Sequence, residues 1–288
     1  MRSGLNSVLK TVPNYKLRNR IRKIARLGFL ITRLRLNGGC VITASAFAIF
    51  LICYSLSAVS DEIDYVMARK KMVQEQLAAR DIADKRTLDV MSWVERHKFV
   101  PERMKRYAYE DMPLPIGEGQ TISQPYIVAL MTQLLELKGN EKVLEVGTGS
   151  GYQAAILAEL AKEVYTIEII ESLGKAAEER LKELGYANIK VKIADGYYGW
   201  EEYAPFDAII VTAAAEYIPQ HLIDQLKVGG RLIIPVGDER MQNLLLVQKE
   251  PGGKLKEYEI TGVLFVPLVG DHPKVEPKEG AKEKKKRR

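Results

Sequence analysis

Between residues 142 and 236, short apolar runs alternate with segments of helical periodicity. The predicted strands are residues 142–147, 163–168, 189–194, 206–212 and 230–236. The predicted helices between them are residues 152–161, 171–184 and 219–226. Strands that alternate with helices are typical of a parallel sheet between two helical layers, so this order predicts an α/β fold with a mostly parallel sheet.

The segments on either side complete the expected fold. Residues 62–100 and 127–138 show helical spacing, whereas residues 109–126 hold prolines and turn glycines among polar side chains and are expected to form a loop. Residues 244–248 and 257–266 are strand-like with no helix between them. We therefore expect N-terminal helices before the sheet and antiparallel strands at its C-terminal end.

Residues 36–60 are an uncharged stretch of 25 residues that follows a strongly basic lead. A transmembrane helix needs about 20 mostly apolar residues, and residues 1–35 carry ten basic side chains and no acidic one. This pattern predicts a signal-anchor or an export signal. The alternative is a translation start near Met67, in which case the folded domain begins after the apolar stretch.

The net charge of +6 hides an acidic body between two basic ends. Residues 36–272 hold 25 basic and 34 acidic side chains, a net charge of −9, whereas residues 273–288 hold eight basic and three acidic ones. An acidic body argues against a broad nucleic-acid-binding face, and the tail is typical of a solvated end. Two cysteines in the apolar stretch and three scattered histidines argue against a disulfide scaffold and a metal site.

A glycine-rich turn, residues 147–151 (GTGSG), joins the first predicted strand of the sheet to the next helix. Glycines in such a turn let the backbone bend tightly and approach a ligand closely. A dinucleotide fingerprint places Gly or Ala at the next position, where this chain has Tyr152. The G-x-G-x-G pattern therefore favours a nucleoside ligand without a pyrophosphate over NAD.

Acidic residues stand at the ends of the next two predicted strands. Glu168 follows Gly151 by 17 residues, where a carboxylate can accept from both hydroxyls of a ribose. Asp195, followed by Gly196, can accept from an adenine amino group. Glu145, just before the glycine turn, is expected to accept hydrogen bonds from the amides of that turn. Because the carboxyl ends of parallel strands share one edge of the sheet, these residues predict a nucleoside-binding cleft there.

Three segments carry a family resemblance. The most specific is residues 115–125 (PIGEGQTISQP), and the glycine turn continues as residues 152–155 (YQAA). Residues 265–268 (FVPL) add a third match. Residues 67–272 thereby resemble the protein-L-isoaspartate O-methyltransferases, which are class I S-adenosylmethionine-dependent methyltransferases. That family typically lacks a membrane segment, so the N-terminal stretch departs from its pattern.

The resemblance implies a Rossmann-like class I methyltransferase fold and a repair reaction. The family moves a methyl group from S-adenosylmethionine to the free α-carboxylate of an L-isoaspartyl residue, and the ester then closes to a succinimide. By resemblance, Ser123 orients the acceptor carboxylate, and Gln120 and Thr121 shape the same pocket. The implied cofactor-binding residues are Glu145, Gly147, Thr148, Gly149, Gly151, Glu168, Asp195 and Gly196. A carboxylate is already ionised at neutral pH, so neither a metal nor a general base is implied.

The chain is thus expected to have five parts. They are a basic lead (1–35), a candidate transmembrane segment (36–60), N-terminal helices with a substrate loop (62–126), a catalytic core that binds S-adenosylmethionine (127–272) and a disordered basic tail (273–288). The expected partners are isoaspartyl-containing proteins and peptides, with no nucleic acid, and the expected state is a monomer.

Two other functions stay open at this stage. One is a methyltransferase with another acceptor; residues 211–215 (VTAAA) lack the Asn/Asp-Pro-Pro element of adenine or cytosine N-methyltransferases. The other is a membrane-tethered module that binds the cofactor without catalysis. An anchor at residues 36–60 with its basic lead inside would place the domain away from a cytosolic methyl donor. We therefore expect a cytoplasmic catalytic domain, with an anchored or exported one as the alternative.

Overall fold

The computed structural model describes residues 64–238 and 240–271, and the chain divides into two units, Met1–Met67 and Ala68–Arg288. The expected basic lead, the candidate transmembrane segment and the basic tail lie outside the described residues. Within the described ranges, no helix is both long and apolar enough to span a membrane. The second unit contains the predicted sheet.

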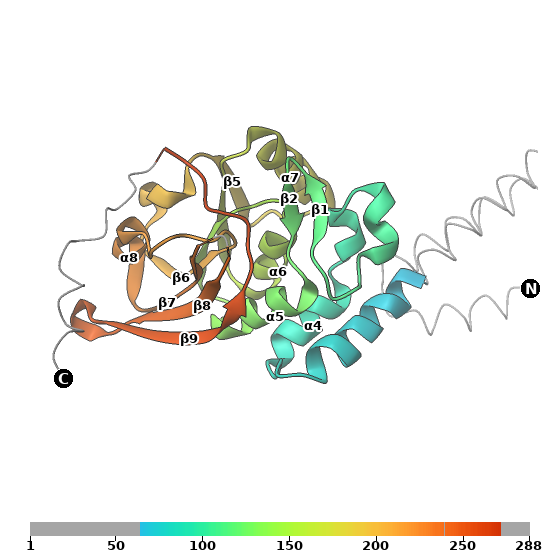
Figure 1. Ribbon diagram of the computed structural model, residues 1–288, viewed down its shortest axis with the longest axis horizontal. Helices are drawn as coiled ribbons and strands as arrows, with labels where there is room; N and C mark the ends of the chain where they lie inside the picture. Colours follow the sequence, from blue (N-terminus) through green and yellow to red (C-terminus); the bar gives the residue numbers. More distant parts are fainter. Residues whose placement is uncertain (1–63, 239, 272–288) are drawn as a thin grey trace, which may run out of the picture. The chain divides into compact units, whose positions relative to one another are not determined.

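A seven-stranded sheet runs through the second unit, in the order β5-β4-β3-β6-β7-β8-β9 (Figure 1). Its strands are β3 (Lys142–Val146), β4 (Glu163–Glu168), β5 (Ile189–Ile193), β6 (Phe206–Val211), β7 (Leu226–Gly237), β8 (Gln242–Lys249) and β9 (Leu255–Val263). β3 to β7 are parallel, and β8 and β9 are antiparallel at one edge, which confirms the predicted fold class. The strand order reverses beside β3, so the carboxyl ends of β3 and β6 form a switch point, where open α/β sheets bind ligands.

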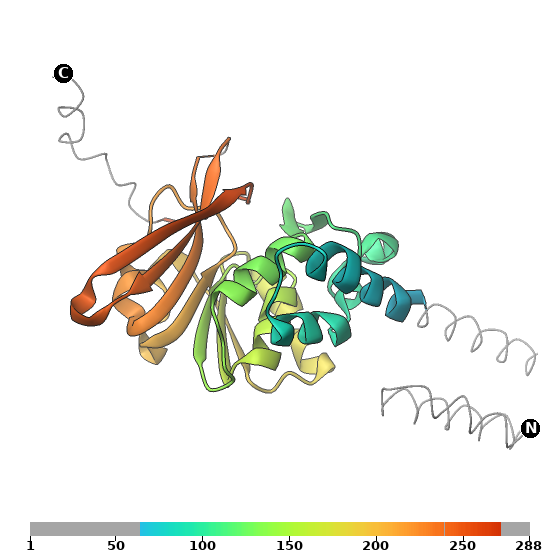
Figure 2. The same cartoon turned by 90° about the horizontal axis from the view of Figure 1, so that it is seen from below.

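Helices cover both faces of the sheet (Figure 1 and Figure 2). The α-helices include α4 (Lys85–Trp93), α5 (Pro125–Leu134), α6 (Tyr152–Leu160), α7 (Glu171–Leu184) and α8 (Gln220–Gln225). A π-helical segment is η1 (Met72–Ala78), and the 3-10 helices are η2 (Arg96–Phe99), η3 (Glu102–Tyr107), η4 (Gly196–Tyr198), η5 (Glu201–Tyr203) and η6 (Pro251–Gly253). α4 packs on α5 and α6, and η1 packs on α4 and α5, so an additional helical layer lies over α6.

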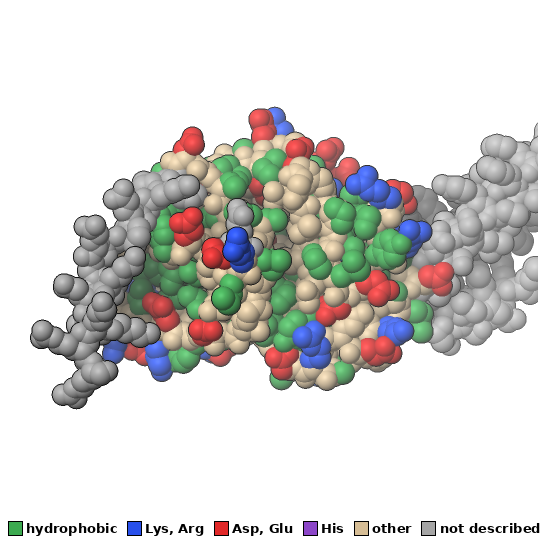
Figure 3. Space-filling view, viewed as in Figure 1, with side chains coloured by type: hydrophobic (Ala, Val, Ile, Leu, Met, Phe, Trp, Pro, Cys, Tyr) green, Lys and Arg blue, Asp and Glu red, His purple; other side chains and the backbone are tan. Residues whose placement is uncertain are grey.

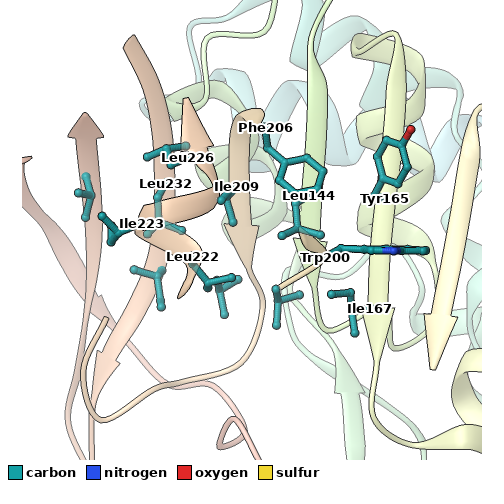
Figure 4. Close-up of a cluster of buried hydrophobic side chains, with 14 of the residues drawn as sticks. Leu144, Tyr165, Ile167, Trp200, Phe206, Ile209, Leu222, Ile223, Leu226 and Leu232 are labelled. Carbon is teal, nitrogen blue, oxygen red and sulfur yellow. The ribbon is translucent and has the colours of Figure 1, made fainter. Parts of the chain in front are cut away.

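The other face of the sheet carries an apolar cluster beneath α8 (Figure 4). Leu144, Ile209 and Leu222 are fully buried in it. Tyr165 and Trp200 meet edge to face with ring centroids 5.6 Å apart, a geometry that aromatic pairs prefer. This packing holds β3, β4 and β6 in register and fixes the strand ends that border the site.

The structure corrects two boundaries. The predicted loop at 109–126 contains a hairpin of β1 (Leu114–Gly117) and β2 (Gln120–Ile122), because the glycines that signalled a loop form its turn. The helix predicted at 127–138 is α5, which begins at Pro125, since proline is favoured in the first turn of a helix. It ends early, before Glu136, whose φ of 51° is left-handed and incompatible with a continuing helix.

Candidate active site

The glycine turn lies at the carboxyl ends of β3 and β4. Gly147, Gly149 and Gly151 have φ values of 100°, 51° and 85°, a region that side chains disfavour. The amides of Gly147 and Thr148 donate to the carbonyl of Ile167 at 2.8 and 3.2 Å, which binds the turn to β4. The backbone therefore passes close to the cleft without side chains that would fill it.

Glu168 ends β4 and is only 6% exposed. Its Oε2 accepts from the amide of Gly149 at 2.8 Å, and its Oε1 accepts from the amide of Ile170 at 3.0 Å. A carboxylate offers about four acceptor positions, so each oxygen retains one for a further donor. Glu168 can therefore hold the glycine turn and accept from ligand hydroxyls at the same time.

Residues 265–270 form a strap across the strand ends. The amide of Ala214 donates to the carbonyl of Val266 at 2.8 Å, and the amide of Leu268 donates back to the Ala214 carbonyl at 2.7 Å. The buried side chain of Gln242 donates from Nε2 to the Phe265 carbonyl at 3.1 Å, and its Oε1 accepts from the backbone amide of Phe265 at 2.7 Å. The strap is thus attached to β8 and to the end of β6.

Two neighbouring cavities share a wall beneath the strap. The smaller, a cleft of about 60 Å³, is lined by the glycine turn, Glu168, Gln120 and strap residues. The larger, about 600 Å³, is lined by Thr121 and Ser123 among others, and we call it the acceptor cavity. Thr212 and Val266 line both. The structure therefore places Ser123 in a cavity that shares two lining residues with the predicted nucleoside cleft.

Gln120 departs from the sequence-based expectation. We expected it in one pocket with Thr121 and Ser123, but it lines the cleft instead. Sequence reasoning did not single out Thr212, whose hydroxyl donates to the carbonyl of Gly147 at 2.7 Å. It also missed Gln242, for which the sequence carries no signal.

Glu145 is fully buried in β3 and does not contact the turn amides, so that expectation was wrong. Its Oε2 accepts from the Thr166 hydroxyl at 2.5 Å, and the Thr148 hydroxyl lies 2.6 Å from that of Thr166. Among the described residues, Oε1 has no hydrogen-bond partner. Burial raises the pKa of Glu145 to about 8, although the bond from Thr166 opposes the shift. Glu145 and Thr148 thus support the turn from behind, and Glu168 holds it directly.

Asp195 caps η4 by accepting from the Tyr197 amide at 2.9 Å. The end of the strap lies against it: a Cβ placed on Gly270 would come within 2.1 Å of Asp195 Oδ2. A Cβ on Gly196 would meet Val146 Cγ1 at 2.4 Å, so the backbone there also needs glycine. Gly196 lines the cleft, and the adenine-binding role of Asp195 stays a prediction.

Two further features of the described residues concern the distribution of charge and of possible metal ligands. On the face that Figure 3 shows, Lys and Arg side chains of the described residues are scattered among acidic ones. In the part of the chain that the structure describes, no group of three or more His, Cys, Asp or Glu side chains is placed to hold a metal ion.

Comparison with known proteins identifies the family. The sequence profile of protein-L-isoaspartate(D-aspartate) O-methyltransferase (PCMT) matches residues 67–273. The chain belongs to this family. It is 57% identical to protein-L-isoaspartate O-methyltransferase 2 of Shewanella sediminis, over 73% of this chain and 86% of that protein. It is 53% identical to protein-L-isoaspartate O-methyltransferase 1 of Cupriavidus necator, over 80% of this chain and 92% of that one.

Solved structures of the PCMT family agree with the fold. One protein-L-isoaspartate O-methyltransferase aligns with a TM-score of 0.65 and 28% identity, covering 70% of this chain and 66% of that one. A family member from Plasmodium falciparum, solved in complex with S-adenosyl-L-homocysteine, aligns with a TM-score of 0.62 and 30% identity, covering 70% of this chain and 98% of that one. The Rossmann-like methyltransferase fold is therefore that of the family.

Proposed function

We propose that this protein transfers a methyl group from S-adenosylmethionine to the free α-carboxylate of L-isoaspartyl residues in damaged proteins, which starts their repair through a succinimide. One observation carries the proposal: the cleft held by Glu168 and the acceptor cavity lined by Ser123 share Thr212 and Val266 as a common wall. A donor in the first and a carboxylate in the second would meet at that wall. Membership of the PCMT family supplies the reaction class.

The residues around the cleft fit a nucleoside methyl donor. Gly147 and Gly149 present backbone without side chains to the cleft, and Glu168 retains acceptor positions for ribose hydroxyls. Gly196 also lines the cleft. The volume of the cleft, about 60 Å³, is smaller than the volume of roughly 300 Å³ or more that ligand-binding sites usually have. We infer that the strap residues Pro267 to Val269, which line the cleft, move outward as the donor enters.

The reaction demands little acid–base chemistry from the protein. S-adenosylmethionine supplies a methyl carbon that bonds to the carboxylate oxygen as its bond to sulfur breaks and the bonding pair stays on sulfur. The acceptor carboxylate is ionised above a pKa of about 3.5, so no side chain has to remove a proton. What the chain supplies is alignment of the two reactants and exclusion of water, which together can lower a barrier by roughly 7–11 kcal/mol.

Ser123 is the residue to which we assign the orienting role. It is half-buried at the border of the acceptor cavity, between β2 and α5, and its hydroxyl can donate to a carboxylate oxygen. Thr121 is exposed in the same cavity, and Gln120 lies on the cleft side of the hairpin. We therefore assign Thr121 to the acceptor side and Gln120 to the donor side.

We also propose that the catalytic domain works in the cytoplasm, where its methyl donor is expected to be made. Protease added to intact cells should then leave the domain uncut, and digestion there would contradict this location. The monomeric state expected from the sequence stays a prediction that light scattering of the full chain can check.

The repair reaction itself can be tested by following its products. The full chain is incubated with S-adenosylmethionine and a peptide that carries one isoaspartyl residue, and the mixture is separated by chromatography. We expect a methyl ester first, then a succinimide, and then a growing fraction of normal aspartyl peptide. A peptide that stays isoaspartyl while the chain binds the cofactor would reject the proposed acceptor.

A further inference from the structure

Arg96 is a fully buried cation that contacts the substrate loop. It lies in η2 with no exposed surface. Its Nε donates to the carbonyl of Ala108 at 2.8 Å, and its Nη2 donates to the carbonyl of Ser123 at 2.7 Å. Burial lowers the pKa of the guanidinium to about 10, which still leaves it charged at neutral pH. A buried charge therefore holds the backbone of Ser123, the residue that we assign to orienting the acceptor carboxylate.

The same guanidinium contacts the cofactor side of the site. Its central carbon lies 4.9 Å from the ring centroid of Tyr152, within cation–π range. Tyr152 is 1% exposed and is the first residue of α6, directly after the last glycine of the turn. Its ring also packs edge to face on Phe99, with centroids 5.4 Å apart. One side chain thus joins the segment at Ser123 to the helix that begins at the glycine turn.

A charge in this position is not explained by packing alone. Burying a guanidinium is costly, and an apolar side chain of similar volume often stabilises a protein as well or better. Within the described residues, Nη1 of Arg96 has no hydrogen-bond partner, so even here the cation is incompletely satisfied. The two carbonyl bonds point to a role in placing the backbone.

The backbone at Ser123 needs such support. Ser123 and Gln124 lie between β2 and α5 in neither helix nor strand, and the side chain of Gln124 does not cap α5. Two residues after Gln124, the backbone amide of Tyr126 donates to the carboxylate of Asp111 at 3.0 Å. Arg96, in η2, therefore holds the connection itself, and Asp111, in the segment before β1, holds the start of α5 that follows it.

We propose that Arg96 is a positioning residue for methyl transfer: it fixes the Ser123 backbone relative to Tyr152, and hence the acceptor cavity relative to the glycine turn. This inference rests on the proposed function, because it assigns a role in the same reaction. Arg96 itself lines neither the cleft nor the acceptor cavity, so it acts through Ser123.

Arg69 offers a matched control in the same helical layer. It is also buried, at 7% exposure, and its guanidinium likewise donates hydrogen bonds to residues far away in the sequence. Its Nε donates to the carbonyl of Ser92 at 2.8 Å, and its Nη1 donates to the hydroxyl of Tyr109 at 3.0 Å. Within the described residues, the guanidinium of Arg69 makes no hydrogen bond to Ser123. A purely structural role for buried arginines in this layer would affect Arg69 and Arg96 variants alike.

The test uses the full chain with Arg96→Lys, Arg96→Met, Arg69→Lys and Arg69→Met. For Arg96→Lys we expect kcat on an isoaspartyl peptide to fall at least tenfold, with the Kd for S-adenosylhomocysteine changed less than twofold. Amide hydrogen exchange in residues 118–124 should become at least tenfold faster, while exchange in the glycine turn stays unchanged. Arg69→Lys should keep kcat within threefold at the same fraction of folded protein. If Arg96→Met fails to fold, Arg96→Lys decides.

The proposal is overturned if Arg96→Lys keeps the wild-type kcat, if the Arg69 and Arg96 variants lose activity in the same proportion to their loss in Tm, or if exchange in residues 118–124 does not change. Failure of the proposed function gives a different result. In that case the wild-type chain itself does not methylate the peptide. The exchange comparison needs no peptide, so it still decides whether Arg96 holds the Ser123 segment.

Discussion

The carboxylate of Glu168 and the amide of Gly149 are joined by a hydrogen bond of 2.8 Å. This contact links the end of β4 to the turn that follows the neighbouring strand β3, and both residues line the cleft. The same carboxylate keeps acceptor positions toward the cleft. We therefore expect the shape of the turn and the affinity for a nucleoside to depend on this one side chain.

Removing that carboxylate should weaken cofactor binding strongly. Hydrogen bonds to a charged group contribute about 1.5–3 kcal/mol each, so Glu168→Ala should raise the Kd for S-adenosylmethionine at least tenfold. Isothermal titration calorimetry measures the change. Glu163→Ala, at the other end of β4, is the control and should leave the Kd unchanged. An unaltered Kd in Glu168→Ala would reject the ribose-binding role.

Gly147 should tolerate no side chain. Its φ is 100°, and an added Cβ would lie 2.4 Å from Thr212 Oγ1. Gly185 is a matched control, because it has a φ of 88° and no atom within 4 Å of an added Cβ. Gly185→Ala should destabilise the fold by about 1 kcal/mol and leave cofactor binding intact. Gly147→Ala should destabilise it more and also weaken binding; equal effects of the two variants in urea unfolding and calorimetry would contradict the steric argument.

The hydroxyl of Ser123 should matter for rate and not for cofactor affinity. Ser123→Ala removes the donor that we assign to the acceptor carboxylate, and loss of such alignment should lower kcat by about 100-fold. The Kd for S-adenosylhomocysteine should stay within twofold, because the cleft is lined by other residues. Ser92→Ala, whose hydroxyl bonds the Asp89 carbonyl, is the control. Wild-type turnover in Ser123→Ala would remove Ser123 from the mechanism.

The sheet could be predicted from the sequence because its strands are short apolar runs that alternate with segments of helical periodicity. β4 and α7 lie where the periodicity placed them, since apolar spacing directly reports burial in a sheet that helices cover on both faces. The β1–β2 hairpin was missed because its strands are four and three residues long, too short to show alternation. Short pairings of this kind depend on tertiary neighbours more than on local propensity.

The candidate site was predictable only in part, for a similar reason. Glu168 and the glycine turn stand at strand ends and can be recognised one strand at a time. Arg96 and Gln242 act through backbone carbonyls and amides 27 and 23 residues away, and a sequence does not show which backbone groups will need a partner. Long-range contacts of this kind come only from the fold.

Glu145 should make stability depend on pH. Its pKa is raised from 4.5 to about 8, mainly by burial, so the folded chain keeps a proton that the unfolded chain releases. The free energy of unfolding should therefore fall as pH rises between these two values, by at most about 1.4 kcal/mol per unit. Glu145→Gln should remove this slope. The free energy of unfolding of the variant should therefore rise relative to that of the wild type between pH 5 and pH 8. Urea unfolding at several pH values measures it, with Glu163→Gln as control; parallel profiles for Glu145→Gln and the wild type would contradict the buried neutral carboxyl.

Binding of the cofactor should slow amide hydrogen exchange in the strap. The amide of Leu268 donates to the Ala214 carbonyl. We infer that the strap opens as the donor enters and closes around it. Amides of residues 265–270 should exchange more slowly once S-adenosylhomocysteine is bound, because the closed strap then packs on the ligand. Mass spectrometry after deuterium labelling measures this, with the β8–β9 hairpin as internal reference. Unchanged exchange in the strap would mean that the donor enters by another route.

The central claim is tested most directly by methyl transfer to a matched pair of peptides. The full chain receives S-adenosylmethionine with a labelled methyl group, and either a peptide with one isoaspartyl residue or the same peptide with normal aspartate. The account predicts base-labile label in the isoaspartyl peptide alone. Label in neither peptide while the cofactor binds, or equal label in both, would contradict it.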